Sequence, residues 1–443
     1  MQTRTFRGGI HPPHAKGTAK SALQALTAPQ RVVLPIQQHI GAPCTPLVKV
    51  GDLVKLGQKI ADSEAPVSAP IHASVSGKVV AVEPHAHPDG KVVNSIIIEN
   101  DGQDTLFEGI KPAGDLTNLT SDQIKQIIRE AGIVGLGGAA FPTHMKLNIP
   151  AGKKIEFVVL NAAECEPYLT CDHRMMLEHP EEIILGLKAL IKASGAQKGY
   201  IAVEVNKLDA IEKLNECLKG DSQIEVVPLD VKYPQGEERQ IIWAVSKREV
   251  PSGGLPWDVG ALINNVTTAW AVGRAIRTGM PLIERPVTID GSAIQNPGNF
   301  MVRLGTLFTH VIEAAGGFKG EPGKLLKGGP MTGMAQYTSD VPVIKSASGI
   351  LAFTTEEAKD ALPSDCIRCG RCVEACPCFL MPLYMASYSK NGMYEAAEKA
   401  NVLDCRECAG CVYVCPAKIP LIHYIRMGKA EIMARRAKQQ KKS

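Results

Sequence analysis

Eight of the 13 cysteines form two runs with the same spacing, and a proline follows each run directly. Both runs read C-x2-C-x2-C-x3-C-P, the pattern in which thiolates hold a cubane iron–sulfur cluster. The first three thiolates of a run can bind one cluster while the fourth binds its neighbour, so the predicted ligand sets are crossed. The sets are Cys366, Cys369, Cys372 and Cys415 for one cluster, and Cys405, Cys408, Cys411 and Cys376 for the other. Two adjacent [4Fe-4S] clusters predict a one-electron relay.

Zinc binding and disulfide formation are the alternative uses of these cysteines. Zinc sites usually take two separated C-x2-C pairs, and disulfide frameworks are typical of secreted chains under about 100 residues. Spacing and the length of 443 residues therefore favour clusters. The remaining cysteines have no ligand spacing and are predicted to be reduced thiols: Cys44, Cys165, Cys171, Cys217 and Cys378. Cys217 lies on an apolar helical stripe and is predicted to be in the core.

A glycine-rich loop containing Gly135, Gly137 and Gly138 is the second feature that could bind a cofactor. Closely spaced glycines let the backbone approach a ligand and direct its N–H groups at phosphate. The loop departs from the dinucleotide fingerprint, because Ala140 occupies a glycine position and no strand precedes it. A tight turn without a ligand is the alternative, and Lys146 would then be a solvated lysine.

An acidic loop follows the apolar strand predicted at 155–160. It contains Asn161, Glu164 and Glu166. Ligands of open α/β sheets bind at the carboxyl ends of the strands, and an asparagine can pair with a flavin or nicotinamide edge through its donor and its acceptor. Two carboxylates could accept hydrogen bonds from ribose hydroxyls and would repel a 2′-phosphate. An exposed acidic loop without a ligand is the alternative.

Alternating helices and strands are expected to hold both loops. Thr120 or Ser121 can cap a helix that ends at Gly132, and the strand at 155–160 has the continuous apolar run of a buried parallel sheet. Pro180 begins a helix that Gly195 closes. The elements predicted after it are strand 199–205, helix 208–219 and strand 224–231. This order predicts a doubly wound α/β domain.

Shorter strands are predicted on both sides of this domain. Residues 30–100 resemble the small β-barrel of biotinyl and lipoyl carrier domains, but Glu64-Ala65 is followed by Pro66-Val67 instead of a lysine for modification, so the barrel is predicted to be structural. Residues 282–335 predict a small β-grasp-like unit, and 336–360 a connector. The long segment between the two cysteine runs has helical periodicity and favours a helical cluster domain.

Composition limits the cellular setting. A chain of 443 residues suggests three or four domains, and a net charge of +4 gives no support for nucleic-acid binding. No apolar run approaches the roughly 18 residues that span a bilayer, and the start lacks the apolar core of a signal peptide. Thiolates and clusters require a reducing compartment. The basic residues near the end could form a solvated terminus or contact an anionic leaflet. These are Arg435, Arg436, Lys438, Lys441 and Lys442.

Several segments carry a resemblance to a known family. The NADH-binding flavin subunit of respiratory complex I contains four similar segments in the same order. In this chain they are Gly135 to Lys146, Asn161 to Pro167, Gly236-Glu237-Glu238 and Leu262 to Val266. That subunit ends in a single-cluster domain, whereas this chain has two cysteine runs. Together with the opening Phe6 to Pro12 and the barrel-like region, the chain resembles the RnfC subunit of the Rnf ion-translocating electron-transport complex.

The resemblance implies cofactors and their binding residues. Residues implied to hold flavin mononucleotide (FMN) are Gly135, Gly137, Gly138, Lys146, Asn161, Asn264 and Asn265. Glu164 and Glu166 would lie beside NAD(H), with Glu237 as a further member, and Phe141 would form an aromatic wall. The chain departs from the complex I pattern at Ala140, which replaces a glycine, and at Ala163, which replaces an aspartate on the flavin.

The implied fold is a multidomain α/β protein. Its expected parts are a barrel-sandwich-like β domain (1–115), a Rossmann-like FMN/NADH domain (116–280), a β-grasp-like SLBB domain (281–340), a helical two-cluster ferredoxin domain (355–430) and a basic tail (431–443).

The implied function is transfer of electrons between nicotinamide and two [4Fe-4S] clusters through FMN, in an ion-translocating ferredoxin:NAD+ oxidoreductase. Other Rnf subunits, some of them membrane-embedded, would be the partners, and ferredoxin would be an indirect one. The chain would be peripheral, on the cytoplasmic face of the inner membrane. The alternatives are a soluble flavin and iron–sulfur cobalamin reductase, whose relatives lack the N-terminal barrel-like region, and a cluster-only relay.

Overall fold

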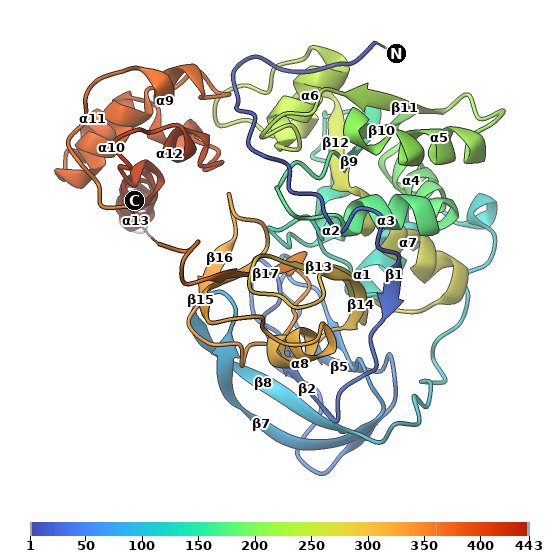
Figure 1. Ribbon diagram of the computed structural model, residues 1–443. Coiled ribbons are helices and arrows are strands. Elements are labelled where there is room, and N and C mark those ends of the chain that lie inside the picture. The colour runs from blue at the N-terminus through green and yellow to red at the C-terminus, as the bar shows by residue number, and fades with distance from the viewer. Residues whose placement is uncertain (1, 360, 441–443) are drawn as a thin grey trace.

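The computed structural model describes residues 2–359 and 361–440. Four units follow one another along the chain, a barrel unit, an α/β unit, a third unit with a six-stranded sheet, and a helical cysteine unit, and an N-terminal strap crosses three of them (Figure 1). This order confirms the predicted multidomain α/β architecture. The residue boundaries of the domains remain predictions.

A four-stranded parallel sheet forms the centre of the α/β unit. Its strands, in the order β11-β10-β9-β12, are Ile224–Leu229, Lys198–Glu204, Phe157–Ala162 and Ala261–Asn265. Alternate residues of β9 face opposite layers: Val158 and Leu160 pack with the helices α4, α5 and α7, whereas Phe157 and Val159 pack with α6. These helices are Pro180–Ser194, Leu208–Cys217, Val266–Thr278 and Glu238–Ser246. The chain leaves β9 toward β10 and later returns to β12 on the other side, so the strand order reverses between β9 and β12. Such a reversal opens a crevice at the carboxyl ends of the strands.

Helix ends in this unit follow the predicted capping. Thr120 caps α1 (Ser121–Glu130) in a capping box with Gln123. Pro180 starts α4, and Gly195 closes it in the left-handed conformation. The prediction for Cys217 is wrong: this residue ends α5 and is exposed, because Leu214 and Leu218 carry the buried face there.

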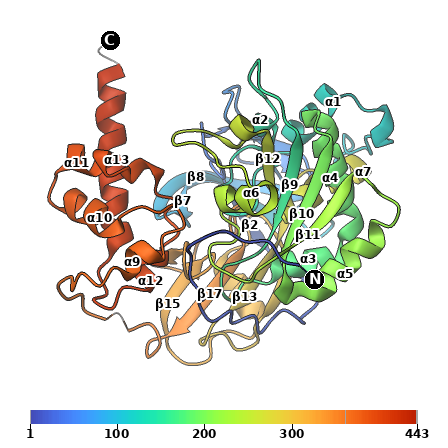
Figure 2. The same cartoon turned by 90° about the horizontal axis from the view of Figure 1, so that it is seen from above.

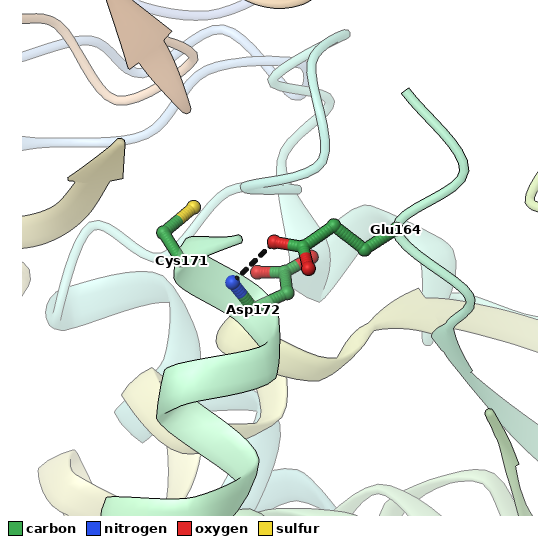
Figure 3. A group of neighbouring side chains, drawn as sticks. All are labelled: Glu164, Cys171 and Asp172. Atoms are coloured by element: carbon green, nitrogen blue, oxygen red, sulfur yellow. Dashed lines mark hydrogen bonds between the residues drawn. The ribbon is translucent and has the colours of Figure 1, made fainter. Parts of the chain in front are cut away.

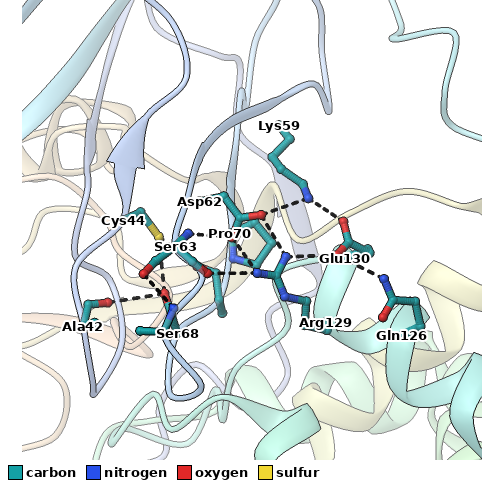
Figure 4. A network of polar contacts seen from close by, with 12 residues as sticks. Ala42, Cys44, Lys59, Asp62, Ser63, Ser68, Pro70, Gln126, Arg129 and Glu130 are labelled. Carbon is teal, nitrogen blue, oxygen red and sulfur yellow. Dashed lines mark hydrogen bonds and ion pairs between the residues drawn. The ribbon is translucent and has the colours of Figure 1, made fainter.

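Two small sheets form the barrel unit. One contains β2, β8, β7 and β4 (Arg31–Pro35, Lys91–Asn100, Gly77–His87 and Leu53–Val54), and the other β3, β5 and β6 (Thr45–Pro46, Lys59–Asp62 and Ile71–His72). The turn after β5, where a carrier domain would present its lysine, is tied to α1 instead (Figure 4). Arg129 donates to both carboxylate oxygens of Asp62 at 2.8 Å and to the Ser63 carbonyl at 3.0 Å. Burial alone would raise the pKa of Asp62, but hydrogen bonds from Arg129 and Lys59 lower it to about 2. The turn therefore has a structural use.

We expect Arg129→Met to loosen the junction between the barrel and α/β units. The pair is mostly shielded from water, so losing two charge-assisted hydrogen bonds should lower the free energy of unfolding by about 1–3 kcal/mol. Anaerobic denaturant titration of the holoprotein measures the change. Arg31→Met is the matched control, because Arg31 and its partner Glu99 are exposed and such pairs add little stability. Equal losses in both variants would contradict a special role for Arg129.

The third unit contains a mixed sheet in the order β1-β14-β13-β17-β15-β16. These strands are Leu23–Ala25, Gly298–Arg303, Glu284–Asp290, Gly349–Thr354, Pro322–Lys327 and Met334–Gln336, and α8 (Phe308–Ala314) packs beside them. The prediction of a connector over 336–360 is wrong, because β17 lies inside that range and between two other strands of the sheet. Its first five residues are buried, so its apolar run is that of an interior strand.

The N-terminal strap, residues 2–27, joins the other units. Arg4 bridges to β11, Ile10 bridges to Tyr233, and β1 adds a parallel strand to the third unit. The Gly9 amide donates to the carbonyl of Ala375 in the cysteine unit at 3.1 Å. The strap therefore contacts the α/β, third and cysteine units, and its path can be followed in Figure 1.

Short helices form the cysteine unit, which confirms the predicted helical cluster domain. They are α9 (Arg371–Glu374), α10 (Pro382–Lys390), α11 (Tyr394–Lys399), α12 (Gly410–Tyr413) and α13 (Leu421–Gln440). Figure 2 shows this unit beside the α/β unit, with α13 extending to the C-terminal end.

The basic residues near the end are part of α13 as far as the structure describes them. Arg435 pairs with Glu395 at 3.3 Å, and Arg436 pairs with Glu398; Lys441 and Lys442 lie outside the described residues. Within the described ranges, the helices lack the combination of length and apolar character that crossing a bilayer requires.

The other helices are short. They are α2 (Thr143–Lys146), α3 (Cys171–Glu178) and the 3-10 helices Leu116–Asn118, Val205–Lys207, Pro256–Val259 and Val402–Asp404.

Candidate functional site

The crevice between β9 and β12 brings together three residues that the sequence analysis selected. Asn161 and Asn265 are register partners at the ends of these strands. The glycine loop reaches them because the Leu136 amide donates to the Thr268 hydroxyl at 2.9 Å. A Cβ at Gly137 would lie 3.2 Å from the Asn265 Cβ, so only a glycine fits there without displacing the asparagine.

Asn264 is the residue in the crevice that most clearly indicates a ligand. It is 3% exposed, and neither polar atom of its carboxamide has a partner in the described part of the chain. Leaving a buried polar group unpaired costs about 1–3 kcal/mol, so a free carboxamide at a sheet edge indicates a bound molecule with donors and acceptors. Gly138 has φ +131°, and no described atom lies within 4 Å of the position of its missing Cβ. The loop backbone is therefore open beside the crevice, and these residues fit FMN.

Lys146 and Asn161 have partners within the protein. Lys146 donates to the Ile263 carbonyl at 2.9 Å and lies 3.7 Å from the Glu238 carboxylate, which holds its ammonium group at the end of β12. Asn161 donates to the Gly236 carbonyl at 2.7 Å. The Gly135 amide closes the glycine loop on the Phe141 carbonyl at 2.9 Å.

Glu164 lies at the start of α3, as Figure 3 shows. Its carboxylate accepts from the backbone amides of Asp172 at 2.6 Å and His173 at 3.3 Å. Burial raises the pKa of Glu164 to about 7 against the opposing positive charge of Lys16. Asp172 in turn accepts from the Asn265 side chain at 2.7 Å. This chain of contacts connects the acidic loop to the crevice and fixes how Asn265 points.

Glu166 contacts the third unit. Its carboxylate accepts from the amides of Met331 at 3.0 Å and Thr332 at 2.9 Å, and from the Thr332 hydroxyl. Lys16 of the strap donates to the backbone carbonyls of Glu164 and Glu166 at 2.8 Å each. Sequence reasoning missed Lys16, because a lysine in an irregular N-terminal segment carries no signal of a distant partner.

Glu237 lies between the α/β and cysteine units. One of its carboxylate oxygens caps α6 by accepting from the amides of Arg239 and Gln240, and the other accepts from Arg406 at 2.7 Å. In the same loop, the Tyr233 hydroxyl donates to the Cys408 carbonyl at 2.8 Å. Residues 233–237 therefore touch the crevice through Asn161 and the cysteine unit through Arg406 and Tyr233. The roles of Arg406 and Tyr233 depend on tertiary contacts and were not predicted.

One cavity, here called the inner cavity, is lined by four thiols that belong to both cysteine runs. They are Cys376, Cys405, Cys408 and Cys411. Apolar side chains make up most of the remaining wall, among them Leu380, Met385 and Ile425. Burial, and then the neighbouring Cys405 and Cys376, raise the pKa of Cys408 to about 12. Free thiolates are thus unfavourable there, whereas iron would stabilise them. The donor set fits a [4Fe-4S] cluster.

The other four cysteines lie farther toward the surface. Burial raises the pKa of Cys372, and the nearby Cys415 and Cys366 add to the effect, so the thiol of the second run lies near the first run, as predicted. Cys366 and Cys369 are exposed, Cys372 is half-buried and Cys415 is buried. This outer set is therefore more accessible to solvent than the inner cavity.

Four family models match the chain in the order of its units. They are the RnfC barrel sandwich hybrid domain (residues 4–103), the Nuo51 FMN-binding domain (128–274), the SLBB domain (286–335) and a 4Fe-4S dicluster domain (359–416). The RnfC-type subunit of the Na(+)-translocating ferredoxin:NAD(+) oxidoreductase complex from Acetobacterium woodii is 52% identical over 98% of both chains. The chain belongs to the RnfC family of these ion-translocating complexes. The corresponding subunit of the proton-translocating complex from Clostridium ljungdahlii is 48% identical over 97% of this chain and 94% of its own.

The family confirms the resemblance found in the sequence. The barrel match argues against the cobalamin reductase alternative, and the FMN-binding and dicluster matches confirm FMN and two [4Fe-4S] clusters as the cofactors of this RnfC family chain. A solved NAD+-reducing [NiFe]-hydrogenase in the air-oxidized state aligns with TM-score 0.50 and 20% identity. That alignment covers 72% of this chain and 63% of the hydrogenase chain, which is less than two thirds of its length, and it shows a shared fold.

Proposed function

We propose that this chain passes electrons between NAD(H) and the other subunits of an ion-translocating ferredoxin:NAD+ oxidoreductase. FMN supplies the chemistry that connects them, because a flavin exchanges two electrons with nicotinamide and single electrons with clusters. The residues assigned to hold FMN are Gly135, Gly137, Gly138, Lys146, Asn161, Asn264 and Asn265. The protein positions the cofactors and excludes water, and it needs no acid or base of its own.

The observation that carries this proposal is the loop at 233–237. Its Gly236 carbonyl accepts from Asn161 at the crevice, while Glu237 and Tyr233 bind the loop that contains Cys405 and Cys408. A flavin in the crevice and a cluster in the inner cavity would lie on opposite sides of one short segment. Electrons would then pass from the crevice to the inner set, and from there to the outer set.

The direct test is anaerobic addition of NADH to the isolated holoprotein. Loss of cluster absorbance together with flavin reduction is the expected result. Flavin reduction without any change in the clusters would overturn the proposed relay. A preparation that binds clusters but no flavin would leave only the cluster-only alternative.

Glu164 and Glu166 are proposed to lie beside NAD(H). We expect Glu164→Gln combined with Glu166→Gln to weaken NADH binding about 10-fold while FMN remains bound, because charge-assisted hydrogen bonds to ribose hydroxyls are lost. Titration of NADH into the oxygen-free protein, with released flavin measured separately, tests this. Glu212→Gln with Glu216→Gln, two exposed positions on α5, is the matched control. Unchanged NADH affinity in the site variant would remove both residues from the site.

The outer cluster is proposed as the point of exchange with partner subunits. Cys366 and Cys369 are exposed, and Leu362 and Ile367 beside them are 91% and 69% exposed. An electron donor or acceptor could approach this set without displacing the α/β unit. We place the chain peripherally on the cytoplasmic face of the membrane, held by other subunits, of which some would be membrane-embedded, with ferredoxin as an indirect partner.

A further inference from the structure

We propose that the ion pair between Arg406 and Glu237 sets the reduction potential of the cluster in the inner cavity. Arg406, the nearer charge, raises this potential and Glu237 lowers it. The proposal rests on the proposed function, because it requires a cluster on the inner thiols. It assigns Glu237 to the cluster side of the loop at 233–237 instead of to the nicotinamide.

The positions of the two charges come from their contacts. Arg406 lies between Cys405 and Cys408 in the sequence and lines the inner cavity with them. Its Nε lies 2.7 Å from a carboxylate oxygen of Glu237. Glu237 is absent from the cavity wall and uses its other oxygen to cap α6. The side chains are 32% and 11% exposed. The pair is thus fixed at both ends and partly shielded from water.

The first turn of α6 also reaches the cavity at a second point. Gln240 is 3.9 Å from the sulfur of Cys378, another residue of the cavity wall. Arg239 lies 3.8 Å from Asp404, the residue before Cys405. Because three neighbouring residues of α6 and its cap meet the cysteine unit, Arg406 is held in one position relative to the inner thiols.

The remaining charges near the second cysteine run are paired among themselves. Glu407 pairs with Arg426 at 2.9 Å and also with Lys429, whose ammonium group donates to the Cys405 carbonyl at 3.0 Å. These groups lie on α13 and the cluster loop, and none of them contacts Glu237 in the described residues. The pair of Arg406 and Glu237 is therefore an electrostatic unit that can be changed separately.

A cluster gains one negative charge when it takes up one electron. A nearby cation stabilises the reduced form, and an anion destabilises it, more strongly where water is excluded. The outer set lacks this device, since the residue that corresponds to Arg406 between its first two cysteines is Ile367, which is 69% exposed. The two clusters thus differ in charge environment although their cysteine spacing is the same.

The test is a redox titration of the full-length holoprotein, monitored by electron paramagnetic resonance so that both clusters are followed separately. We expect Arg406→Gln to lower the inner midpoint potential and Glu237→Gln to raise it, while the outer potential stays unchanged. Arg406→Lys should retain most of the wild-type value, because it keeps the charge. Arg368→Gln is the matched control, since Arg368 is an exposed arginine between the first two outer cysteines.

Opposite shifts from the two halves of one ion pair cannot arise from a general loosening of the domain. Shifts in the same direction, or no inner shift in either variant, would overturn the inference. If Arg406→Gln fails to assemble the inner cluster, Glu237→Gln decides alone: an upward shift supports the inference, and an unchanged potential overturns it. Wild-type protein without two cluster signals would instead overturn the proposed function.

Discussion

Cys376→Ser abolishes the cluster held by the second cysteine run, although Cys376 belongs to the first run. We expect this result because Cys376 shares the inner cavity with Cys405, Cys408 and Cys411. Iron per chain should fall from about eight to about four, the content of one [4Fe-4S] cluster. Iron and sulfide analysis of oxygen-free protein gives the number, and electron paramagnetic resonance identifies the cluster that remains.

The identity of the lost cluster distinguishes crossed from uncrossed ligand sets. The signal that survives in Cys376→Ser should be missing in Cys369→Ser, and Cys415→Ser should behave like Cys369→Ser. Cys378→Ser is the matched control: this thiol also lines the inner cavity but has no ligand spacing, so both clusters should assemble. Loss of the same cluster in Cys376→Ser and Cys369→Ser would show that each run binds its own cluster.

Asn264→Leu separates flavin binding from protein stability. The substitution keeps the approximate shape of the side chain and removes two buried polar atoms that lack partners among the described residues. The flavin-free protein should become more stable by about 1–3 kcal/mol, because the unpaired carboxamide no longer has to be desolvated. FMN affinity should fall by about 10- to 100-fold, because hydrogen bonds to the ligand are lost.

The two effects have opposite signs, which a purely structural asparagine could not produce. Flavin fluorescence titration measures the affinity, and denaturant unfolding of the flavin-free protein measures the stability. Asn148→Leu is the control, since Asn148 is an exposed asparagine after α2 and should affect neither quantity. Weaker flavin binding with an equal loss of stability would assign Asn264 to the core instead of the site.

Local patterns predicted a large part of this protein. The spacing of eight cysteines specified two clusters, because a cubane requires thiolates at fixed short intervals. Apolar periodicity and caps specified the α/β unit and the ends of α1 and α4, because these signals act within a few residues. The strand β17 was missed, since a short apolar run among turn residues does not reveal which sheet it joins.

The amino-acid sequence by itself determined which cofactors this chain can hold, and which residue types offer themselves as their ligands. Only the tertiary structure decided what those residues contact. It left Asn264 unpaired within the described ranges, engaged Glu166 with the third unit and placed Glu237 beside Arg406. The physical reason is the distance along the chain. Ligand spacing and capping act over a few residues, whereas 169 positions separate Glu237 from Arg406, and only packing of the α/β unit against the cysteine unit joins them.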